Sequence, residues 1–304
     1  MHDQVAYLNN NCVPAIAIGD VEEPDIIQQV QNGTYVVVYG SPWYLLSTTT
    51  WRGLFDVPSF KKMLIGVAID EAHCIVQWGL QGAKKVPFRK WHGCLGELNS
   101  MFPETPMIIL TATATKSTRE QILDSLHLSL NDSIIKQSPD RANLTYVSSY
   151  LDKNEPLQHQ FGGLIKEIQK MGKDTPRTII YCQTRKQCSI LFRMFEIYLR
   201  EKMFRDGSRL PRDRLVEVFH AETPQSVKTH IGENMAEENG HLRVLISTIA
   251  FDMGVNCKQV RRIIHFGPSK SEELCVQECG RAGRDGLPSV CFLMYNGLFP
   301  YTVM

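Results

Sequence analysis

Two carboxylates directly follow a short apolar run in the first quarter of the chain. The run occupies residues 64–69, and Asp70 and Glu71 come next. Such a run is typical of a strand buried on both faces of a parallel sheet, where ligands bind beyond the carboxyl ends of the strands. There Asp70 can hold a magnesium ion, and Glu71 can orient or deprotonate an attacking water. The competing interpretation is an ordinary solvated strand end.

A second group with phosphate chemistry lies near the other end of the chain. Gln277, Arg281 and Arg284 follow one another at intervals of four and three residues, which predicts one side of a helical turn. Arginine stays charged, and its guanidinium can donate two parallel hydrogen bonds to the oxygens of one phosphate. The alternative is a basic helix end paired with Glu278 or Asp285. Two features favour a divided phosphoryl-transfer site instead: the glycines at 280 and 283 beside the arginines, and the carboxylate pair far away in the sequence.

The bulk properties restrict the possible classes of protein. The 304 residues suffice for two domains, and 43% hydrophobic residues can build their cores. A net charge of +1 means that any nucleic-acid surface must be local.

The nine cysteines contain no C-x-x-C pair and suit reduced thiols inside a cell. Cys275 and Cys279 are interpreted as helix positions, so no zinc site is expected. No run approaches the ~20 apolar residues of a membrane span, and the polar first residues do not form a signal peptide.

Apolar runs alternate with segments of helical periodicity, which predicts an α/β protein. Strands are expected at 13–18, 35–39, 64–69, 107–110, 177–182, 215–219, 242–246, 260–266 and 289–295, with the last one at an edge of its sheet. Helices are expected at 24–31, 95–102, 157–171 and 190–202. A polar segment around Pro139 predicts a linker at 138–145, between a first domain at 1–137 and a second at 146–304.

Several motifs, in the right order, resemble those of RecQ-type helicases. Residues 70–79 (DEAHCIVQWG) resemble motif II, 111–115 (TATAT) motif III and 277–286 (QECGRAGRDG) motif VI. Residues 183–185 and 247–256 resemble motifs IV and V. The resemblance covers nearly the whole chain and implies two RecA-like parallel-sheet domains, the first incomplete.

This resemblance implies ATP with Mg²⁺ as the nucleotide, and single-stranded or forked DNA unwound 3′ to 5′. It also implies a nuclear location and a role in DNA repair and recombination, and it leaves the oligomeric state open. The implied catalytic residues are Asp70, which would also hold Mg²⁺, Glu71, His73, Gln277, Arg281 and Arg284. The implied nucleotide contacts are Asp70, Glu71, Gly254, Arg281 and Arg284.

An aromatic and basic segment follows motif II, where the family senses single-stranded DNA. Trp78, Phe88 and Trp91 can stack on bases, and Arg89, like the lysines at 84, 85 and 90, can meet phosphates. Packing of the domain surface explains them equally well, because this segment is several residues longer than in the family. Further candidates for DNA contacts are Arg185, Ser247 and Thr248. A surface salt bridge is an equal alternative for Arg185.

The chain also departs from the family pattern. It begins in a segment that resembles motif Ia, and no stretch matches G-x-x-x-x-G-K-[ST], the phosphate-binding loop. Glu222 and Asp252 stand where the family has glycine, and Trp43 where it has glutamate. We expect a RecQ-like helicase fragment whose own ATPase is weak or absent. The alternative is a non-enzymatic DNA-binding relic or scaffold module.

Overall fold

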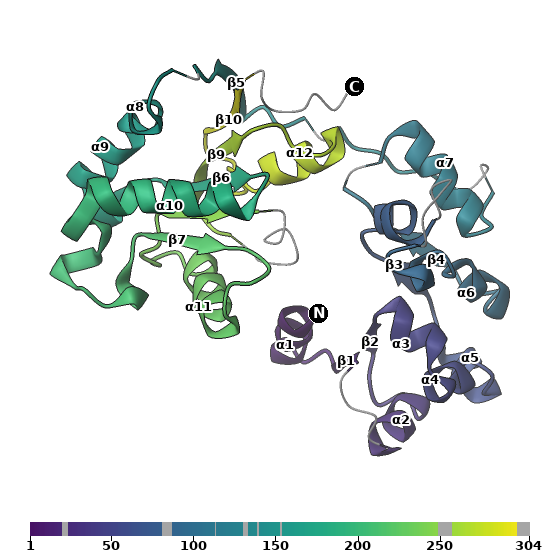
Figure 1. The fold of residues 1–304 in the computed structure, drawn as a ribbon. Helices are drawn as coiled ribbons and strands as arrows, with labels where there is room; N and C mark the ends of the chain where they lie inside the picture. The colour runs from purple at the N-terminus through teal and green to yellow at the C-terminus, as the bar shows by residue number, and fades with distance from the viewer. Residues whose placement is uncertain are drawn as a thin grey trace. The chain divides into compact units, whose positions relative to one another are not determined.

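The computed structural model describes residues 1–19, 24–80, 87–112, 114–129, 133–138, 140–152, 154–248 and 257–296. The chain divides into two compact units, Met1–Gln137 and Ser138–Met304. Each combines helices with parallel strands, which confirms the predicted α/β class (Figure 1). Gly254, Asp252, Lys84, Lys85 and Pro139 lie outside the described residues. None of the helices in the described ranges has the length and apolar character needed to span a bilayer.

The first unit contains two short parallel sheets. Strand β1 (Ala15–Ile18) pairs with β2 (Val37–Gly40), and β3 (Val67–Ile69) pairs with β4 (Met107–Ile109). Its α-helices are α1 (His2–Asn10), α2 (Pro24–Gln31), α3 (Pro42–Ser47), α4 (Thr49–Leu54), α5 (Pro58–Met63), α6 (Gly96–Met101) and α7 (Lys116–Ser125). A π-helix, η1 (Ile75–Gly79), and a 3₁₀ helix, η2 (Lys90–His92), complete the unit.

The strand before Asp70 is not buried on both faces, so that part of the prediction is wrong. Ile69 is buried in the core of the first unit, whereas Ala68 is exposed and Ile65 is 86% exposed. Burial of both faces needs helices on both sides of a sheet. In the described part of this unit, helices pack on the Ile69 face, and Ile108 beside Ala68 is 58% exposed.

The second unit is built on one all-parallel sheet with the strand order β5-β10-β9-β6-β8-β7. These strands are β5 (Leu144–Tyr150), β6 (Arg177–Cys182), β7 (Val216–Phe219), β8 (Val244–Ser247), β9 (Val260–Phe266) and β10 (Ser289–Tyr295). Because β10 lies between β5 and β9, the prediction of an edge strand at 289–295 is wrong. Strand β5 begins inside the segment predicted as a linker.

Helices cover both faces of this sheet, and alternate residues of β6 face two different cores. Ile180 and Cys182 pack with α8 (Leu157–Gln160), α9 (Gly162–Met171) and α10 (Arg185–Leu199). Ile179 and Tyr181 pack with α11 (Gln225–Ala236) and α12 (Glu272–Cys279). The result is a three-layer sandwich (Figure 1). Among the described residues of this unit, short 3₁₀ segments also occupy Gly172–Asp174, Arg200–Met203, Arg205–Gly207 and Pro211–Asp213.

Arg177, the first residue of β6, is a buried cation that binds backbone carbonyls. It is 1% exposed, and its Nη1 and Nη2 donate over 2.7–3.1 Å. The acceptors are the carbonyl oxygens of Asn234, Met235, Glu237, Gly240 and Lys258. Asn234 and Met235 belong to the last turn of α11, whose carbonyls lack helical partners and carry the negative end of the helix dipole. Burial first, and then the charge of Arg243, lowers the pKa of Arg177 to about 10, so the side chain remains charged at neutral pH.

Replacement of Arg177 by methionine is expected to lower the free energy of unfolding of the second unit by at least about 3 kcal/mol, because several buried carbonyls would lose their donor. Urea denaturation of the two proteins measures this difference. Arg193→Met is the matched control, since Arg193 is exposed on α10 and pairs with Glu196. Removal of that surface pair should cost less than about 1 kcal/mol. Equal losses in the two variants would contradict the role given to Arg177.

Candidate nucleotide and nucleic-acid sites

The first unit brings Asp70, Glu71 and His73 together with Thr111 where β3 and β4 end. Asp70 and Glu71 are exposed, and Asp70 Oδ1 accepts a hydrogen bond from the Glu71 N–H over 2.8 Å. His73 is buried, and its Nδ1 lies 3.2 Å from Glu71 Oε2 and 3.3 Å from Thr111 Oγ1. The site therefore combines one open carboxylate with a second carboxylate that an imidazole orients. That arrangement suits a hard cation and a nearby water.

The backbone at Glu71 is strained. Its φ is 48°, in the left-handed region that residues other than glycine rarely adopt and that costs on the order of 1–3 kcal/mol. The next N–H, that of Ala72, donates to the carbonyl of Leu110 over 2.9 Å and so ties this turn to the end of β4. Strain of this kind persists where the surrounding structure holds it, and it clusters at functional sites.

The π-helix η1 presents Trp78 beside Phe88 and Arg89. The Trp78 and Phe88 rings meet edge to face, with centroids 6.3 Å apart. The Arg89 guanidinium lies 5.0 Å from the Trp78 centroid and 5.6 Å from that of Phe88. Phe88 is 75% exposed, and His92 contacts Trp78 on another side. These side chains form an aromatic platform with a cation beside it, a combination that can stack on a nucleobase and meet its phosphate.

Gly79 and Gly93 lie before and after the extra residues that follow Trp78, and their backbones are in close contact. A Cβ on Gly79 would lie 2.2 Å from the backbone nitrogen of Gly93, and a Cβ on Gly93 would lie 2.5 Å from the Gly79 carbonyl oxygen. This approach is possible because neither residue has a side chain. Nearby, the Arg89 N–H donates to the Trp78 carbonyl over 2.9 Å, and the rings of Trp78 and Phe88 are in contact. Trp91, in contrast, is half-buried against the core of the first unit.

Gln277, Arg281 and Arg284 do not share one helical turn, so that prediction is wrong. Helix α12 ends at Cys279, and Gly283 adopts a φ of 55°, which breaks the helical course before Arg284. Arg281 is buried, whereas Arg284 is exposed. Burial first, and then the positive charge of Arg281, lowers the pKa of Arg284, so the two guanidiniums lie within electrostatic reach of each other.

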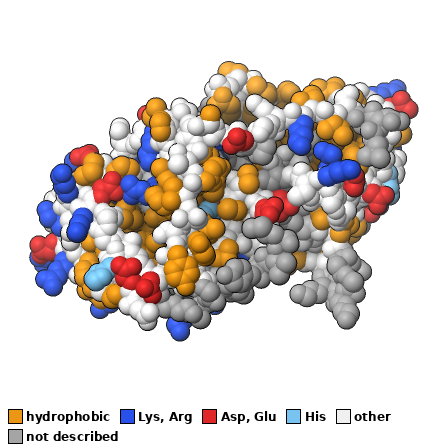
Figure 2. Space-filling view, turned by 90° about the horizontal axis from the view of Figure 1, so that it is seen from above, with side chains coloured by type: hydrophobic (Ala, Val, Ile, Leu, Met, Phe, Trp, Pro, Cys, Tyr) orange, Lys and Arg blue, Asp and Glu red, His pale blue; other side chains and the backbone are white. Residues whose placement is uncertain are grey.

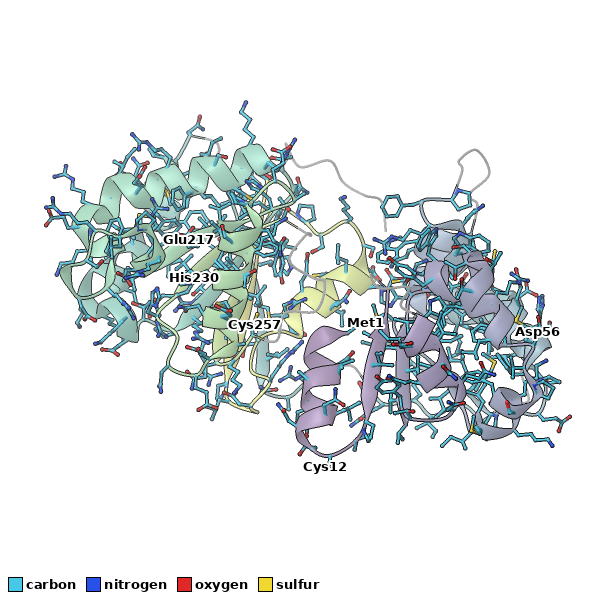
Figure 3. All side chains as sticks on the ribbon, turned by 90° about the horizontal axis from the view of Figure 1, so that it is seen from below. Met1, Cys12, Asp56, Glu217, His230 and Cys257 are labelled. Carbon is cyan, nitrogen blue, oxygen red and sulfur yellow. The ribbon has the colours of Figure 1, made fainter. Side chains whose placement is uncertain are left out.

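Cys257 is the buried thiol beside Arg281 (labelled in Figure 3). Burial raises the pKa of this thiol, while the charges of Arg281 and Arg284 and a hydrogen bond with Arg281 act in the opposite direction. The thiol of Cys257 therefore lies within electrostatic reach of both guanidiniums, of which that of Arg281 is buried and that of Arg284 is exposed.

Arg141 and Asn143, which the sequence analysis did not single out, fasten the loop that carries the two arginines. Arg141 donates to the carbonyl oxygens of Gly280 (3.1 Å), Ala282 (3.0 Å) and Gly283. Asn143 Nδ2 donates to those of Gly283 and Leu287, each over 2.9 Å. A Cβ on Gly283 would lie 2.5 Å from Asn143 Nδ2, so glycine is required there for both its φ and its size. The partners lie some 140 residues apart in sequence, and no local pattern could have indicated them.

The predicted DNA contacts of the second unit differ in their availability. Arg185, at the start of α10, pairs with the carboxylate of Glu222, so the salt bridge that was its alternative role is present. Ser247 is fully buried, and its hydroxyl oxygen lies 2.9 Å from the Phe219 carbonyl oxygen and 2.7 Å from that of Thr248, so its one proton has two backbone acceptors within reach. Thr248 is half-buried, and its N–H reaches the Phe219 carbonyl over 3.3 Å. In this conformation a phosphate can approach Thr248 but not the Ser247 hydroxyl.

Basic side chains are dispersed on the surface that Figure 2 shows. Lysine and arginine lie there in small separate groups, with acidic and apolar side chains beside them. The distribution agrees with the net charge of +1, and any attraction for nucleic acid has to come from local sites such as Arg89 beside Trp78.

Comparison with solved structures establishes the fold. The DNA-bound DUF1998 helicase MrfA superimposes with a TM-score of 0.69 at 17% identity, over 97% of this chain and 38% of that one. Dbp5 of S. cerevisiae, bound to RNA and ADP BeF3, gives a TM-score of 0.59 at 16% identity, over 93% of this chain and 64% of that one. The α/β units of this chain therefore have the architecture of the RecA-like domains found in helicases.

Sequence comparison establishes the family. Residues 160–286 match the helicase conserved C-terminal domain. The bifunctional 3′-5′ exonuclease/ATP-dependent helicase WRN of Mus musculus is 31% identical over 298 residues, 97% of this chain and 19% of that protein. The ATP-dependent DNA helicase RecQ of Pasteurella multocida is 33% identical over 300 residues, 97% of this chain and 42% of that protein. The chain spans less than half the length of these relatives. Since the matches extend over the same residues as the motifs, the chain belongs to the RecQ family of helicases.

Proposed function

We propose that this chain carries a large part of the motor of a RecQ-like DNA helicase, which couples ATP hydrolysis to 3′–5′ unwinding of forked DNA, in keeping with a nuclear role in repair and recombination. We also propose that these 304 residues hydrolyse ATP weakly or not at all by themselves. The observation that carries the proposal is the cluster of Asp70, Glu71, His73 and Thr111 at the ends of β3 and β4. Carboxylates at strand ends of a parallel sheet are where a nucleotide is expected.

The residues of the cluster fit a magnesium nucleotide. Asp70 offers an exposed carboxylate, the oxygen ligand that Mg²⁺ prefers. When bound, the ion would polarise the phosphate oxygens. Glu71 would accept a proton from the attacking water, and His73, 3.2 Å from its carboxylate, would orient it. Arg281 and Arg284 of the second unit would neutralise the charge on the transferred phosphate, Gln277 would assist them, and Gly254 would contact the nucleotide.

DNA would engage two kinds of surface. Phe88 and Trp78 would stack on bases of the single strand, and Arg89 between them would bind the adjoining phosphate. Thr248 and Arg185 of the second unit would meet the backbone, although Arg185 is occupied by Glu222 in the structure. Trp91 would act through packing beneath this surface rather than by stacking.

A non-enzymatic DNA-binding protein derived from a helicase is the second candidate. It is favoured by two features: Glu222 neutralises a basic residue on the expected DNA path, and no stretch of these 304 residues matches the phosphate-binding loop. The two candidates differ in one measurable property, ATP turnover once a phosphate-binding loop is supplied.

The carboxylate of Glu71 is expected to be essential for turnover. The 304-residue chain should hydrolyse ATP near background, and a fusion that supplies the phosphate-loop segment of a RecQ relative at the amino end should gain DNA-stimulated ATPase. In that fusion, Glu71→Gln should lower kcat at least about 100-fold, because a positioned general base contributes that much or more. The exposed loop carboxylate of Glu104 is the control, and Glu104→Gln should leave kcat unchanged. An inactive fusion that still binds DNA would support the relic, and robust ATPase from the unfused chain would contradict the proposal.

Loss of the Phe88 ring is expected to weaken binding of single-stranded DNA. One base stacked on an aromatic residue is worth about 1–3 kcal/mol, so Phe88→Ala should raise the Kd for an oligothymidylate roughly 5- to 150-fold. Fluorescence anisotropy measures this Kd. Tyr7, which is 68% exposed on α1, serves as the aromatic control, and Tyr7→Ala should bind like the parent chain. An unchanged Kd for Phe88→Ala would remove the platform from the DNA path.

Neutralisation of Glu222 is expected to strengthen DNA binding, because Arg185 would become available to a phosphate. Glu222→Gln should raise the affinity several-fold at low salt and steepen the slope of log K against log salt by about 0.7, the value for one extra phosphate contact on a single strand. Glu201→Gln is the matched control, since Glu201 is another exposed carboxylate paired with an arginine, Arg209. The double change Arg185→Ala with Glu222→Gln should abolish the gain. A gain that persists in the double variant would show that Glu222 acts by general charge alone.

A further inference from the structure

A histidine and two cysteines of the second unit lie together on the α12 face of the sheet. Cys275 and Cys279 are four residues apart on α12 and therefore share one side of that helix. His265, from β9, completes the group, and one ligand atom from each residue lies within 4.8 Å of the others. The sequence pointed to the two cysteines only as helix positions, because the histidine reaches them through the fold and not through a spacing motif.

Glu278 holds the imidazole of His265 in the orientation that a metal ligand needs. His265 Nε2 donates to Glu278 Oε2 over 2.8 Å, and the Ser269 hydroxyl donates to the same oxygen over 2.5 Å. Tyr181 stacks on the imidazole, with ring centroids 5.6 Å apart and planes 18° apart. A histidine that binds a metal generally gives its other ring N–H to a carboxylate in this way. Nδ1 of His265 is the nitrogen left for an ion.

The cysteines also have the required chemistry and access. Each cysteine offers one sulfur, and both sulfurs lie within 4.8 Å of a ring nitrogen of His265. A thiolate is the form that binds a metal. His265 and Cys279 are each 2% exposed, whereas Cys275 is only half-buried and leaves a way in for an ion.

We propose that His265, Cys275 and Cys279 bind one Zn²⁺ per chain, with water in the fourth position. Nitrogen and thiolate ligands in tetrahedral array select this ion. In such a site two sulfur ligands stand about 3.7 Å apart, so the side chains would close by no more than about 1 Å. Binding would release the thiol protons of Cys275 and Cys279 to solvent. The ion would join β9 to the end of α12, two residues before Arg281. This proposal is independent of ATP hydrolysis.

Titration with Co²⁺, a spectroscopic substitute for Zn²⁺, tests the site in the full chain. We expect thiolate-to-cobalt charge-transfer absorption and the strong visible bands of a tetrahedral site, saturating at one equivalent and bleached by Zn²⁺. Cys275→Ser and Cys279→Ser should each weaken binding at least about 100-fold, and Glu278→Gln, which removes only the orienting carboxylate, roughly 10- to 100-fold. Cys94→Ser should bind like the parent chain, since Cys94 lies in the first unit.

Alkylation of the native parent chain provides a test that needs no variant to fold. Stoichiometric Zn²⁺ should slow modification of Cys275 at least about 10-fold, followed by mass spectrometry. It should not slow modification of Cys12, an exposed thiol just after α1 (labelled in Figure 3). Absence of a tetrahedral cobalt spectrum, or equal alkylation of Cys275 with and without Zn²⁺, would overturn the proposal.

Discussion

The position of Arg281 and Arg284 in the second unit depends on another arginine, Arg141. Arg141 donates to three carbonyls of the loop after α12, those of Gly280, Ala282 and Gly283, and Asn143 fills the space that a side chain on Gly283 would take. A similar arrangement of hydrogen bonds occurs at Arg177, whose guanidinium donates to carbonyls at the end of α11. In both places an arginine, half-buried at Arg141 and buried at Arg177, donates to several backbone carbonyls. Arginine suits this because its donors are several, planar and fixed in direction.

The elements with strong periodicity could be predicted from the sequence, but which elements lie beside them in the fold could not. The segment predicted as a helix at 95–102 forms α6 (Gly96–Met101), and Leu95, Leu98 and Phe102 in and beside it are buried. The place of β10 in the middle of the sheet was missed, because a run of apolar residues indicates burial but does not indicate which strands lie beside it. The helical arrangement of Arg281 and Arg284 failed for a different reason. A single glycine with positive φ redirects the chain, and spacing rules assume that the helix continues.

The candidate sites show the same division between chemistry and geometry. Residue types indicated which side chains can bind a phosphate or stack on a base, and the structure adds what already occupies them. Arg185 is engaged by Glu222, at a position where the family has glycine, and the Ser247 hydroxyl is used by backbone carbonyls. Trp78 and Phe88 are in contact although they are separated by a longer segment than in the family, and beside them Gly79 and Gly93 pack backbone against backbone. The physical effect of a residue that departs from the family pattern can therefore be assigned only when the contacts of its side chain are known.

The strand order of the second unit also determines when this unit can fold. The neighbour of β5 in the sheet is β10, and their register joins Leu144 to Ser289. The chain between them must be synthesised before this pair can form, and closing so long a loop is entropically costly. During translation β5 would therefore keep an open hydrogen-bonding edge until β10 leaves the ribosome. A sheet that needs this long-range pairing is expected to assemble slowly, and β5 is expected to need protection from aggregation until β10 is available.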